Sequence, residues 1–487
     1  MPIKGCRTLS RGAFFAALFL FSGSFARATS VKVSGRQLLV NGNVFTIQGV
    51  AYSPTPVGSQ PTPPINYVFW TDTTQPYNTD FPLMKAMGAN VVRTYDARQA
   101  TAAALNAAQN NGLYVIMGYP VAIGDVQTST GQAGVISGFK TMVQTWASHP
   151  AVLMWELGNE VTNEDPADLT FATSWYALLN SAAASAKAAE ISQTGTFHPV
   201  STSNKDINNI GFAAAGATDA QMTSLDVWGA TVYRGPSINC PVNVFVQYST
   251  SSAKPFYVAE FGMTAFNSTT DKEDQIQQAS IIGSQWPVIK SNLSATNSSN
   301  VALGGAVFEW SDEWWKALGS NNTSDSVQDA PAGGDYLNTC YPQAAQYEEW
   351  FGITSIQSGT NGRRLRQAYY TLQTYWSPNN AAGVQNMPLI LWVKNFPNPF
   401  QTGSGTRLQI QLSQPATLGV QIYDMAGHKV NELAGPPQDL GSNLMQFHWS
   451  GYTGGGNQAS CGLYIARVEA SLGSKDQVEY RRIVIVK

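Results

Sequence analysis

Short runs of apolar residues alternate with longer amphipathic stretches over the first 376 residues. Continuous apolar runs of this kind are typical of parallel strands that are buried on both faces. Eight such runs lie at residues 49–53, 89–96, 112–120, 151–160, 198–204, 225–233, 255–262 and 304–310. Helical spacing occurs between them, for instance at residues 79–88, 101–112, 135–149, 167–190 and 274–293. Eight strands that alternate with helices predict an α/β fold, a closed (β/α)8 TIM barrel.

The pattern changes on either side of these strands. Two alternating runs around Asn41-Gly42 predict a β-hairpin before the first barrel strand, and a helical pattern at 363–376 would close the barrel. We therefore expect a barrel with its N-terminal hairpin at residues 29–376. A stretch rich in Pro, Asn and Gly predicts a linker at 377–393. Short alternating strands with Gly and Pro turns then predict a small all-β immunoglobulin-like sandwich at 394–487.

The first 28 residues have the pattern of a secretory signal peptide. Three basic residues precede an apolar run at 13–21, and Ala26-Arg27-Ala28 matches a small-residue cleavage site. The apolar run is too short for a permanent membrane span, and no other stretch approaches one. We expect a secreted or cell-surface protein of the type that Gram-negative cells export; a buried N-terminal helix is the alternative.

Composition narrows the class of partner. Charged residues make up 12% of the 487 residues, about half the usual share, and the formal net charge is −3. A mildly acidic chain without a basic stripe argues against nucleic acid as a partner. The four histidines are scattered, without metal-ligand spacing, and no glycine-rich nucleotide motif opens a helix. Cys240 and Cys340 lie in loop-like sequence and are the candidate disulfide pair.

The candidate chemistry lies at the carboxyl ends of the predicted strands, where barrels of this kind carry their functional side chains. Glu160 and Glu260 each terminate an apolar run, and a carboxylate in that position is costly unless it is paired or used. Two carboxyl groups that face one cavity are what glycosidic bond cleavage requires: one protonated, the other ionised. Arg93 would keep the second one ionised, and Tyr233 could donate a hydrogen bond to it. The other polar or aromatic strand ends are Tyr52, Tyr95, Tyr119, Asn159 and Trp310.

Other acidic residues compete for the same roles. Glu156 shares side-chain parity with Glu160 but lies deeper in its strand, so we interpret it as structural. Glu309, Asp312 and Glu313 are rivals for the second carboxylate, although a substrate-contacting or loop-fixing role fits them better. The aromatic residues near the predicted rim would offer flat faces to sugar rings, which fits a neutral, hydroxyl-rich substrate. They are Trp70, Tyr95, Tyr119, Trp310, Trp314 and Trp315.

At these residues the sequence resembles clan A glycoside hydrolases, a group of (β/α)8 retaining enzymes. The segments HPAVLMWELGNEV (149–161) and KPFYVAEFGM (254–263) look like the two signature strands of that clan. The likeness covers nearly all of residues 31–376. It implies that Glu160 is the general acid/base and Glu260 the nucleophile.

The resemblance also implies the roles of the neighbouring residues. Asn159 would bind the sugar 2-hydroxyl, and Arg93 and Tyr233 would position Glu260. Trp310 would form the floor of the subsite that holds the attacked sugar. Retaining chemistry implies carboxyl groups about 5–5.5 Å apart and requires no metal or organic cofactor.

Within the clan, Gly158-Asn159-Glu160-Val161 resembles β-1,3-glucanosyltransferases and family-two-like barrels. The same strand also looks like endo-β-mannanases, which usually carry Pro at the position of Val161. The resemblance implies a β-linked polysaccharide or oligosaccharide, with β-glucan favoured, and leaves hydrolysis and transglycosylation open. The alternatives are a mannanase-type hydrolase, an inverting hydrolase on the same fold, and a non-catalytic carbohydrate-binding protein on a degenerate barrel.

The tail is similar to FlgD-like immunoglobulin-fold and C-terminal sorting domains. The segments 395–400, 420–430, 447–468 and 481–487 carry this likeness. It implies contact with export machinery or attachment to the cell surface, with simple stabilisation of the barrel as the alternative. Cys461 is expected to be a small buried residue of this domain.

Overall fold

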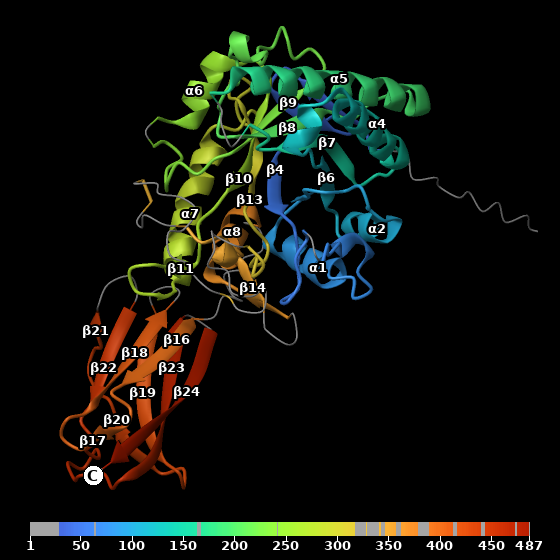
Figure 1. Ribbon diagram of the computed structural model, residues 1–487. Coiled ribbons are helices and arrows are strands. Elements are labelled where there is room, and N and C mark those ends of the chain that lie inside the picture. Colours follow the sequence, from blue (N-terminus) through green and yellow to red (C-terminus); the bar gives the residue numbers. More distant parts are fainter. Residues whose placement is uncertain are drawn as a thin grey trace, which may run out of the picture.

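Eight parallel strands close into a barrel in the computed structural model of the protein (Figure 1). Described here are residues 29–62, 65–162, 167–240, 242–316, 328, 340–341, 346–356, 362–377, 389–412, 416–439, 444–472 and 475–486. The predicted signal peptide (1–28) and most of the predicted linker (377–393) lie outside these residues.

The barrel strands follow each other around the cylinder in chain order, and the last one pairs with the first. They are β4 (Ile47–Ala51), β5 (Val91–Arg93), β6 (Tyr114–Tyr119), β7 (Val152–Asn159), β8 (Val200–Lys205), β9 (Val227–Thr231), β10 (Phe256–Phe261) and β13 (Ala302–Val307). Each overlaps one of the eight apolar runs, so the predicted TIM barrel is confirmed. Nearly all of their residues are buried, because helices cover the outer face and side chains fill the inside.

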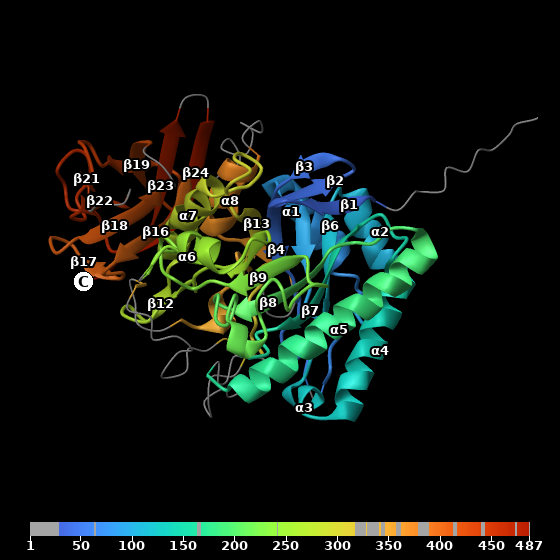
Figure 2. The same cartoon turned by 90° about the horizontal axis from the view of Figure 1, so that it is seen from above.

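Helices wrap the outside of the barrel (Figure 2). They are α1 (Tyr77–Met87), α2 (Ala102–Asn110), α3 (Ile123–Val126), α4 (Ser129–Trp146), α5 (Leu169–Thr194), α6 (Val244–Ser251), α7 (Gln275–Ser291) and α8 (Gln367–Trp376). Several begin at a side chain that accepts a hydrogen bond from the first turn, such as Thr101, Asp168 and Asp274. The helical pattern predicted at 363–376 is helical only from Gln367, because β15 (Arg363–Leu365) pairs with β14 (Thr354–Ile356).

The N-terminal hairpin covers the end of the barrel where the strands begin. It consists of β1 (Val31–Ser34), β2 (Gln37–Val40) and β3 (Asn43–Phe45). Asn41 and Gly42 have φ angles of 51° and 81°, which a tight hairpin turn requires, so the predicted hairpin is confirmed. Val31 and Leu38 pack with Ile47 and other residues near the strand starts. The opposite end of the barrel is therefore the one available for chemistry.

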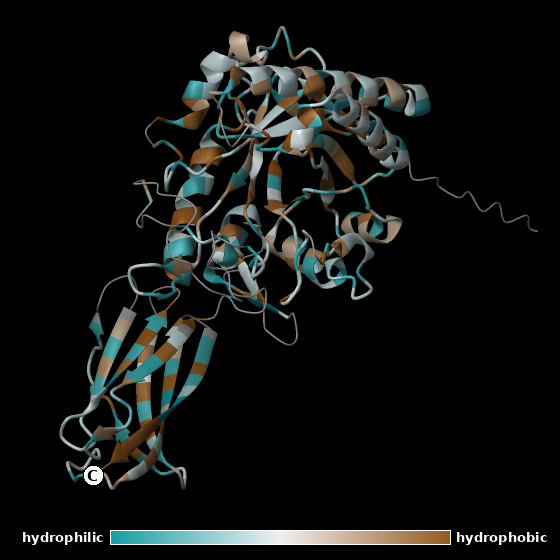
Figure 3. Ribbon diagram, in the orientation of Figure 1, coloured by the Kyte–Doolittle hydropathy of each residue, from teal (hydrophilic) through white to brown (hydrophobic). Residues whose placement is uncertain are grey.

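The C-terminal domain is a sandwich of two sheets, as predicted. One sheet contains β16 (Ile390–Phe396), β18 (Thr406–Leu412), β22 (Leu444–Trp449) and β21 (Gln438–Asp439). The other contains β17 (Phe400–Gln401), β24 (Lys475–Val486), β23 (Gly462–Leu472), β19 (Thr417–Asp424) and β20 (Lys429–Glu432). Apolar and polar residues alternate along these strands (Figure 3).

Two details of this domain differ from the expectations. Cys461 is exposed, not buried, because it lies in the turn just before β23 and outside the hydrophobic core of the sandwich. Strand β16 begins at Ile390, within the stretch expected to be linker. Among the described helices, none combines the length and the apolar character that a bilayer span needs.

Candidate active site

A cavity of about 320 Å³ opens at the carboxyl ends of the barrel strands. Residues from six of the eight strand ends line it, including Asn159 at the end of β7, Glu160 directly after it and Glu260 on β10. The two predicted carboxyl groups therefore face the same cavity. The rest of the described lining comes from the loops that follow the strands.

Glu260 is held by three hydrogen-bond donors. The guanidinium Nη1 of Arg93 lies 2.8 Å from its Oε1, and the hydroxyl of Tyr95 donates to the same oxygen at 2.7 Å. The hydroxyl of Tyr233 donates to Oε2 at 2.9 Å. Donors of this kind stabilise the ionised form of a carboxyl group and fix its orientation. The Glu260 side chain therefore has a defined position at the cavity wall.

Arg93 connects Glu260 to strand β7. It is fully buried, and besides Glu260 it donates through Nη2 to Asn159 Oδ1 at 2.6 Å and through Nε to Glu156 Oε1 at 2.9 Å. The hydroxyl of Tyr257 donates to the other oxygen of Glu156. Glu156 is 2% exposed and does not line the cavity, which agrees with the structural interpretation.

Glu160 has a different environment. Burial, followed by the negative charge of Glu260, raises its pKa to about 7, while a hydrogen bond from Thr231 Oγ1 opposes the shift. Its carboxyl group is thus poised near neutral pH to give or take a proton, as a general acid/base must be.

The backbone that presents Glu160 has an unusual conformation. The φ angles are 75° at Gly158 and 49° at Glu160, and the pairing of β7 with β8 is irregular between Glu156 and Asn159. A Cβ atom at Gly158 would lie 2.7 Å from Trp175, so glycine is required for both space and conformation. This irregularity turns the chain so that Asn159 and Glu160 both line the cavity.

Tyr52, Tyr95 and Tyr233 line the cavity as well. Tyr52 also donates to Asp80 Oδ2 at 3.0 Å, which anchors it to α1.

Two predicted substrate-binding residues lie elsewhere among the described residues. Trp310 is fully buried and does not line the cavity; its ring packs 6.3 Å from that of Tyr369 on α8. The reason is that β13 ends at Val307, three residues before the apolar run ends, so that Phe308 faces the cavity instead. Tyr119 packs against Phe139 on α4, with ring centroids 5.8 Å apart, and is also absent from the lining.

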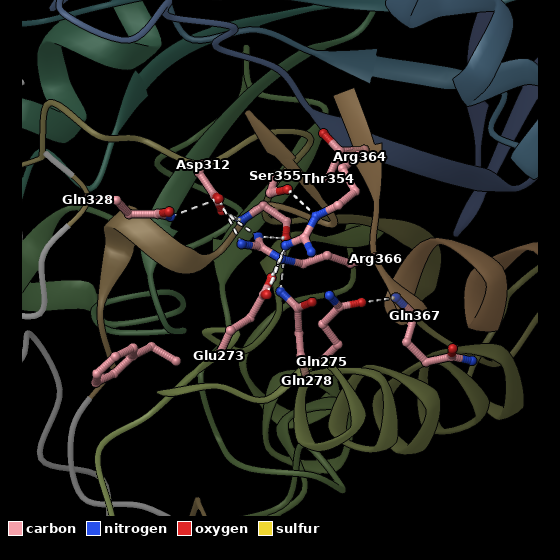
Figure 4. A network of polar contacts seen from close by, with 12 residues as sticks. Glu273, Gln275, Gln278, Asp312, Gln328, Thr354, Ser355, Arg364, Arg366 and Gln367 are labelled. Atoms are coloured by element: carbon pink, nitrogen blue, oxygen red, sulfur yellow. Dashed lines mark hydrogen bonds and ion pairs between the residues drawn. The ribbon is translucent and has the colours of Figure 1, made fainter. Parts of the chain in front are cut away.

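The three rival carboxyl groups after β13 have separate environments. Glu309 is fully buried, and both its oxygens lack a hydrogen-bond partner among the described residues, so burial raises its pKa well above the usual value. Asp312 is paired with the buried Arg366, as Figure 4 shows. Only Glu313 of the three lines the cavity.

Several lining residues were not predicted from the sequence, among them Phe308, Lys316 and Glu348. Glu348 begins the 3-10 helix η4 (Glu348–Trp350), far from any strand end, and no sequence pattern marks it. Thr231, which contacts Glu160, is the last residue of β9 and could have been predicted by alternation, because it lies two positions before the predicted Tyr233.

The disulfide candidates are joined. Cys240 and Cys340 form a disulfide with their Cα atoms 6.0 Å apart. It connects the loop after β9 with the long segment after β13. Both segments contribute residues to the cavity wall, so the crosslink ties two sides of the site together.

Comparison with known proteins supports the barrel and the sandwich separately. The profile of a family described as glucanosyltransferase matches residues 21–316, and that of the FlgD Ig-like domain matches residues 398–474. These matches confirm both resemblances. No curated protein matches the sequence.

Solved structures with a similar fold include a β-glucuronidase of Bacteroides uniformis, with a TM-score of 0.53 and 13% identity. Another is B. uniformis β-glucuronidase 2, covalently bound to cyclophellitol-6-carboxylate aziridine, with a TM-score of 0.52 and 13% identity. Each alignment covers 94% of this chain and 48% of the other, so the chain spans about half the length of these structures. At this identity the likeness concerns the fold alone.

Proposed function

Because this chain belongs to the glucanosyltransferase family of glycoside hydrolases, we propose that it cleaves β-linked glucan and transfers or hydrolyses the released segment. β-1,3-glucan is the favoured substrate. The observation that supports this best is the contrast between two carboxyl groups in one cavity. Glu260 accepts three hydrogen bonds, whereas the pKa of Glu160 is raised to about 7.

The first step of the proposed reaction is a displacement at the anomeric carbon. The Glu260 carboxylate attacks this carbon, and the bond to the leaving oxygen breaks as Glu160 donates its proton to that oxygen. The sugar is now an ester of Glu260. Arg93, Tyr95 and Tyr233 keep the attacking oxygens in place, so little reorganisation is needed.

The second step reverses the roles. Glu160, now a carboxylate, takes a proton from water or from a sugar hydroxyl, and the resulting oxygen attacks the anomeric carbon and releases Glu260. Asn159, which Arg93 fixes through its side-chain oxygen, would hold the 2-hydroxyl of the sugar with its amide group. The identity of the acceptor decides between hydrolysis and transglycosylation.

Substitution of the two carboxyl groups tests the proposal. Glu160→Gln and Glu260→Gln should each abolish turnover of β-1,3-glucan while the protein stays folded, measured by reducing-sugar release and product masses. Glu432→Gln, an exposed position on β20, is the matched control and should retain full activity. If either site variant keeps near-wild-type turnover, the assigned roles are wrong.

The same assays separate the alternatives. Release of reducing sugar from mannan but not from glucan would favour a mannanase-type hydrolase, and binding without release would favour a carbohydrate-binding protein.

The stereochemistry of the product tests the two-step mechanism. NMR of the product should show retention of the anomeric configuration; inversion would contradict the two-step mechanism. Azide should rescue Glu260→Ala, because a small anion can replace the missing carboxylate.

We also propose that the protein is exported and that the sandwich serves export or surface attachment. The Cys240–Cys340 disulfide supports an oxidising compartment, where such bonds persist. Expression of the full chain in a Gram-negative host should yield an extracytoplasmic protein that begins near residue 29, determined by N-terminal sequencing. A cytoplasmic protein with an intact N-terminus would contradict this.

A further inference from the structure

Three charged residues on one wall of the cavity have no role in the proposed reaction. Glu313 and Lys316 lie in the segment after β13, and Glu348 begins η4. The Lys316 ammonium lies 2.5 Å from Glu348 Oε2 and 3.6 Å from Glu313 Oε2. Lys316 is thus already paired with carboxylates of its own chain.

Glu313 is the member of this cluster whose hydrogen bonding is incomplete. It is 4% exposed, it lines the cavity, and its Oε2 has no hydrogen-bond partner among the described residues. The described contact of this oxygen is the Lys316 ammonium at 3.6 Å, which is longer than a hydrogen bond. A buried carboxyl oxygen that accepts no hydrogen bond is costly, which points to a donor that binds there from outside.

The cluster lies within electrostatic reach of both reacting groups. The charge of Glu260 contributes to the raised pKa of Glu313, and the charge of Glu348 contributes to that of Glu160. Glu260 and the three charged residues line the same cavity of about 320 Å³, so a sugar ring positioned for attack by Glu260 would lie close to these side chains.

We propose that Glu313, Lys316 and Glu348 form a hydroxyl-binding subsite that accepts an uncharged sugar ring and rejects a uronate. This inference rests on the proposed function, because the sugar is the substrate proposed above. Neighbouring hydroxyl groups on a pyranose can each donate and accept a hydrogen bond. Glu313 offers the acceptor, and the ammonium group of Lys316, with three N–H donors, offers the donor.

The aromatic neighbour of the cluster adds a surface for the ring. Trp315 lines the cavity, and the Lys316 ammonium lies 5.1 Å from its ring centroid. The cluster thus combines an apolar face with a donor and an acceptor, which is the usual composition of a site for a small polar ligand.

The charge of the cavity explains the expected rejection of uronates. Among the described lining residues, Lys316 carries the one ammonium group, whereas five residues carry a carboxyl group. These five are Asp96, Glu160, Glu260, Glu313 and Glu348. The carboxylate of a uronate would lie among these acidic groups, and the Lys316 ammonium is already paired with Glu348 and Glu313, so specificity arises from repulsion as well as from contact.

Binding measurements test the subsite independently of turnover. Calorimetry with a β-1,3-gluco-oligosaccharide should show that Glu313→Ala and Lys316→Met each weaken the Kd roughly tenfold to hundredfold, the usual loss for a hydrogen bond to a charged group. Glu313→Gln should recover part of the loss, and Glu432→Gln should bind like the wild type. Melting curves and near-UV circular dichroism check that each variant is folded.

Kinetics supply the second readout. In the same two variants KM should rise by a similar factor while kcat changes less than about threefold, because the contact serves binding more than the chemical step. The wild type should turn over an aryl β-glucuronide at least about a hundredfold less efficiently than the matching β-glucoside, as expected for an unpaired charge in the site.

The outcomes separate this inference from the proposed function. An active enzyme whose Glu313→Ala and Lys316→Met variants bind within twofold of the wild type overturns the subsite only. Efficient turnover of the glucuronide also overturns it. If the wild type is inactive but binds the oligosaccharide, and the two variants bind it more weakly, the subsite stands and the proposed function is wrong. A wild type that neither binds nor cleaves overturns both.

Discussion

Glu160 and Glu260 are the same residue type in one cavity, but their partners differ. Glu260 accepts hydrogen bonds from Arg93, Tyr95 and Tyr233, whereas Glu160 accepts one from Thr231. The charge of Glu260 also acts on Glu160 and favours its neutral form. The two environments thus differ in the way that the proposed roles require, because acid and base roles in many active sites are divided by unlike surroundings.

The pH dependence of the proposed reaction follows from this difference. Because Glu160 must be protonated for the first step and its pKa is about 7, kcat/KM should fall as pH rises above about 7. The check is a pH–rate profile with an aryl β-glucoside. In Glu260→Gln, the pKa of Glu160 followed by NMR should be lower, because the charge that raises it is gone. A profile that stays flat to alkaline pH would contradict this assignment.

At the scale of the element, the end of β7 shows how a strand presents a side chain. Gly158→Ala would place a methyl group 2.7 Å from Trp175 and from Val161, at a φ of 75°. We expect a loss of activity of about a hundredfold, because a displacement of about 1 Å at a reacting group can have that effect. The matched control is Gly124→Ala in α3, where nothing lies within 4 Å of the added Cβ. Equal activity of the two variants would contradict this role of Gly158.

A buried ion pair connects the segment after β13 to the outer helices. Arg366, just before α8, donates to both oxygens of Asp312 at 2.5 and 2.8 Å and to Glu273 at 2.8 Å (Figure 4). Asp312 directly precedes Glu313, so the pair fixes the backbone of the proposed subsite. Gln328 donates to Asp312 at 2.8 Å as well.

Arg366→Met should destabilise the protein by about 3–5 kcal/mol, because it leaves Asp312 buried without its counter-charge. Urea unfolding measures this loss. The control is Arg98→Met, which breaks an ion pair whose two side chains are 53% and 41% exposed and should cost less than about 1 kcal/mol. A similar small loss in both variants would show that the buried pair does not stabilise the fold.

The strands could be predicted from the sequence because a buried parallel strand is a continuous apolar run. The same property caused the error at Trp310. The run at 304–310 ends in Phe308, Glu309 and Trp310, and nothing in it shows that β13 stops at Val307 and that Phe308, not Trp310, lines the cavity. The pattern of apolar runs predicts strand-end residues such as Glu160 and Glu260. It does not predict Glu348, because the contact of Glu348 with Lys316 depends on how a segment distant in the sequence folds back.

At the scale of the whole molecule, the barrel and the sandwich do not share a hydrophobic core among the described residues. The largest core of the barrel contains buried residues from Val50 to Trp376, and the core of the sandwich contains residues from Leu389 to Ile485. Domains with cores of their own can usually fold independently.

A chain of residues 29–388 should therefore keep the kcat/KM of the full protein within about twofold, and residues 389–487 should unfold cooperatively by themselves. Kinetic assays and thermal unfolding of each piece provide the check, with the full chain as the reference. A barrel that aggregates or loses activity without the sandwich would mean that the second domain stabilises the first.

The left-handed backbone at Glu160 has a consequence for the stability of the whole protein. A residue other than glycine costs of order 1–3 kcal/mol in such a conformation, and burial of the Glu160 carboxyl group adds to this. Glu160→Gly should therefore raise the melting temperature while it abolishes turnover. A directed-evolution experiment that selects for heat resistance alone would therefore favour inactive variants at position 160. Each round of such an experiment has to include a screen for turnover.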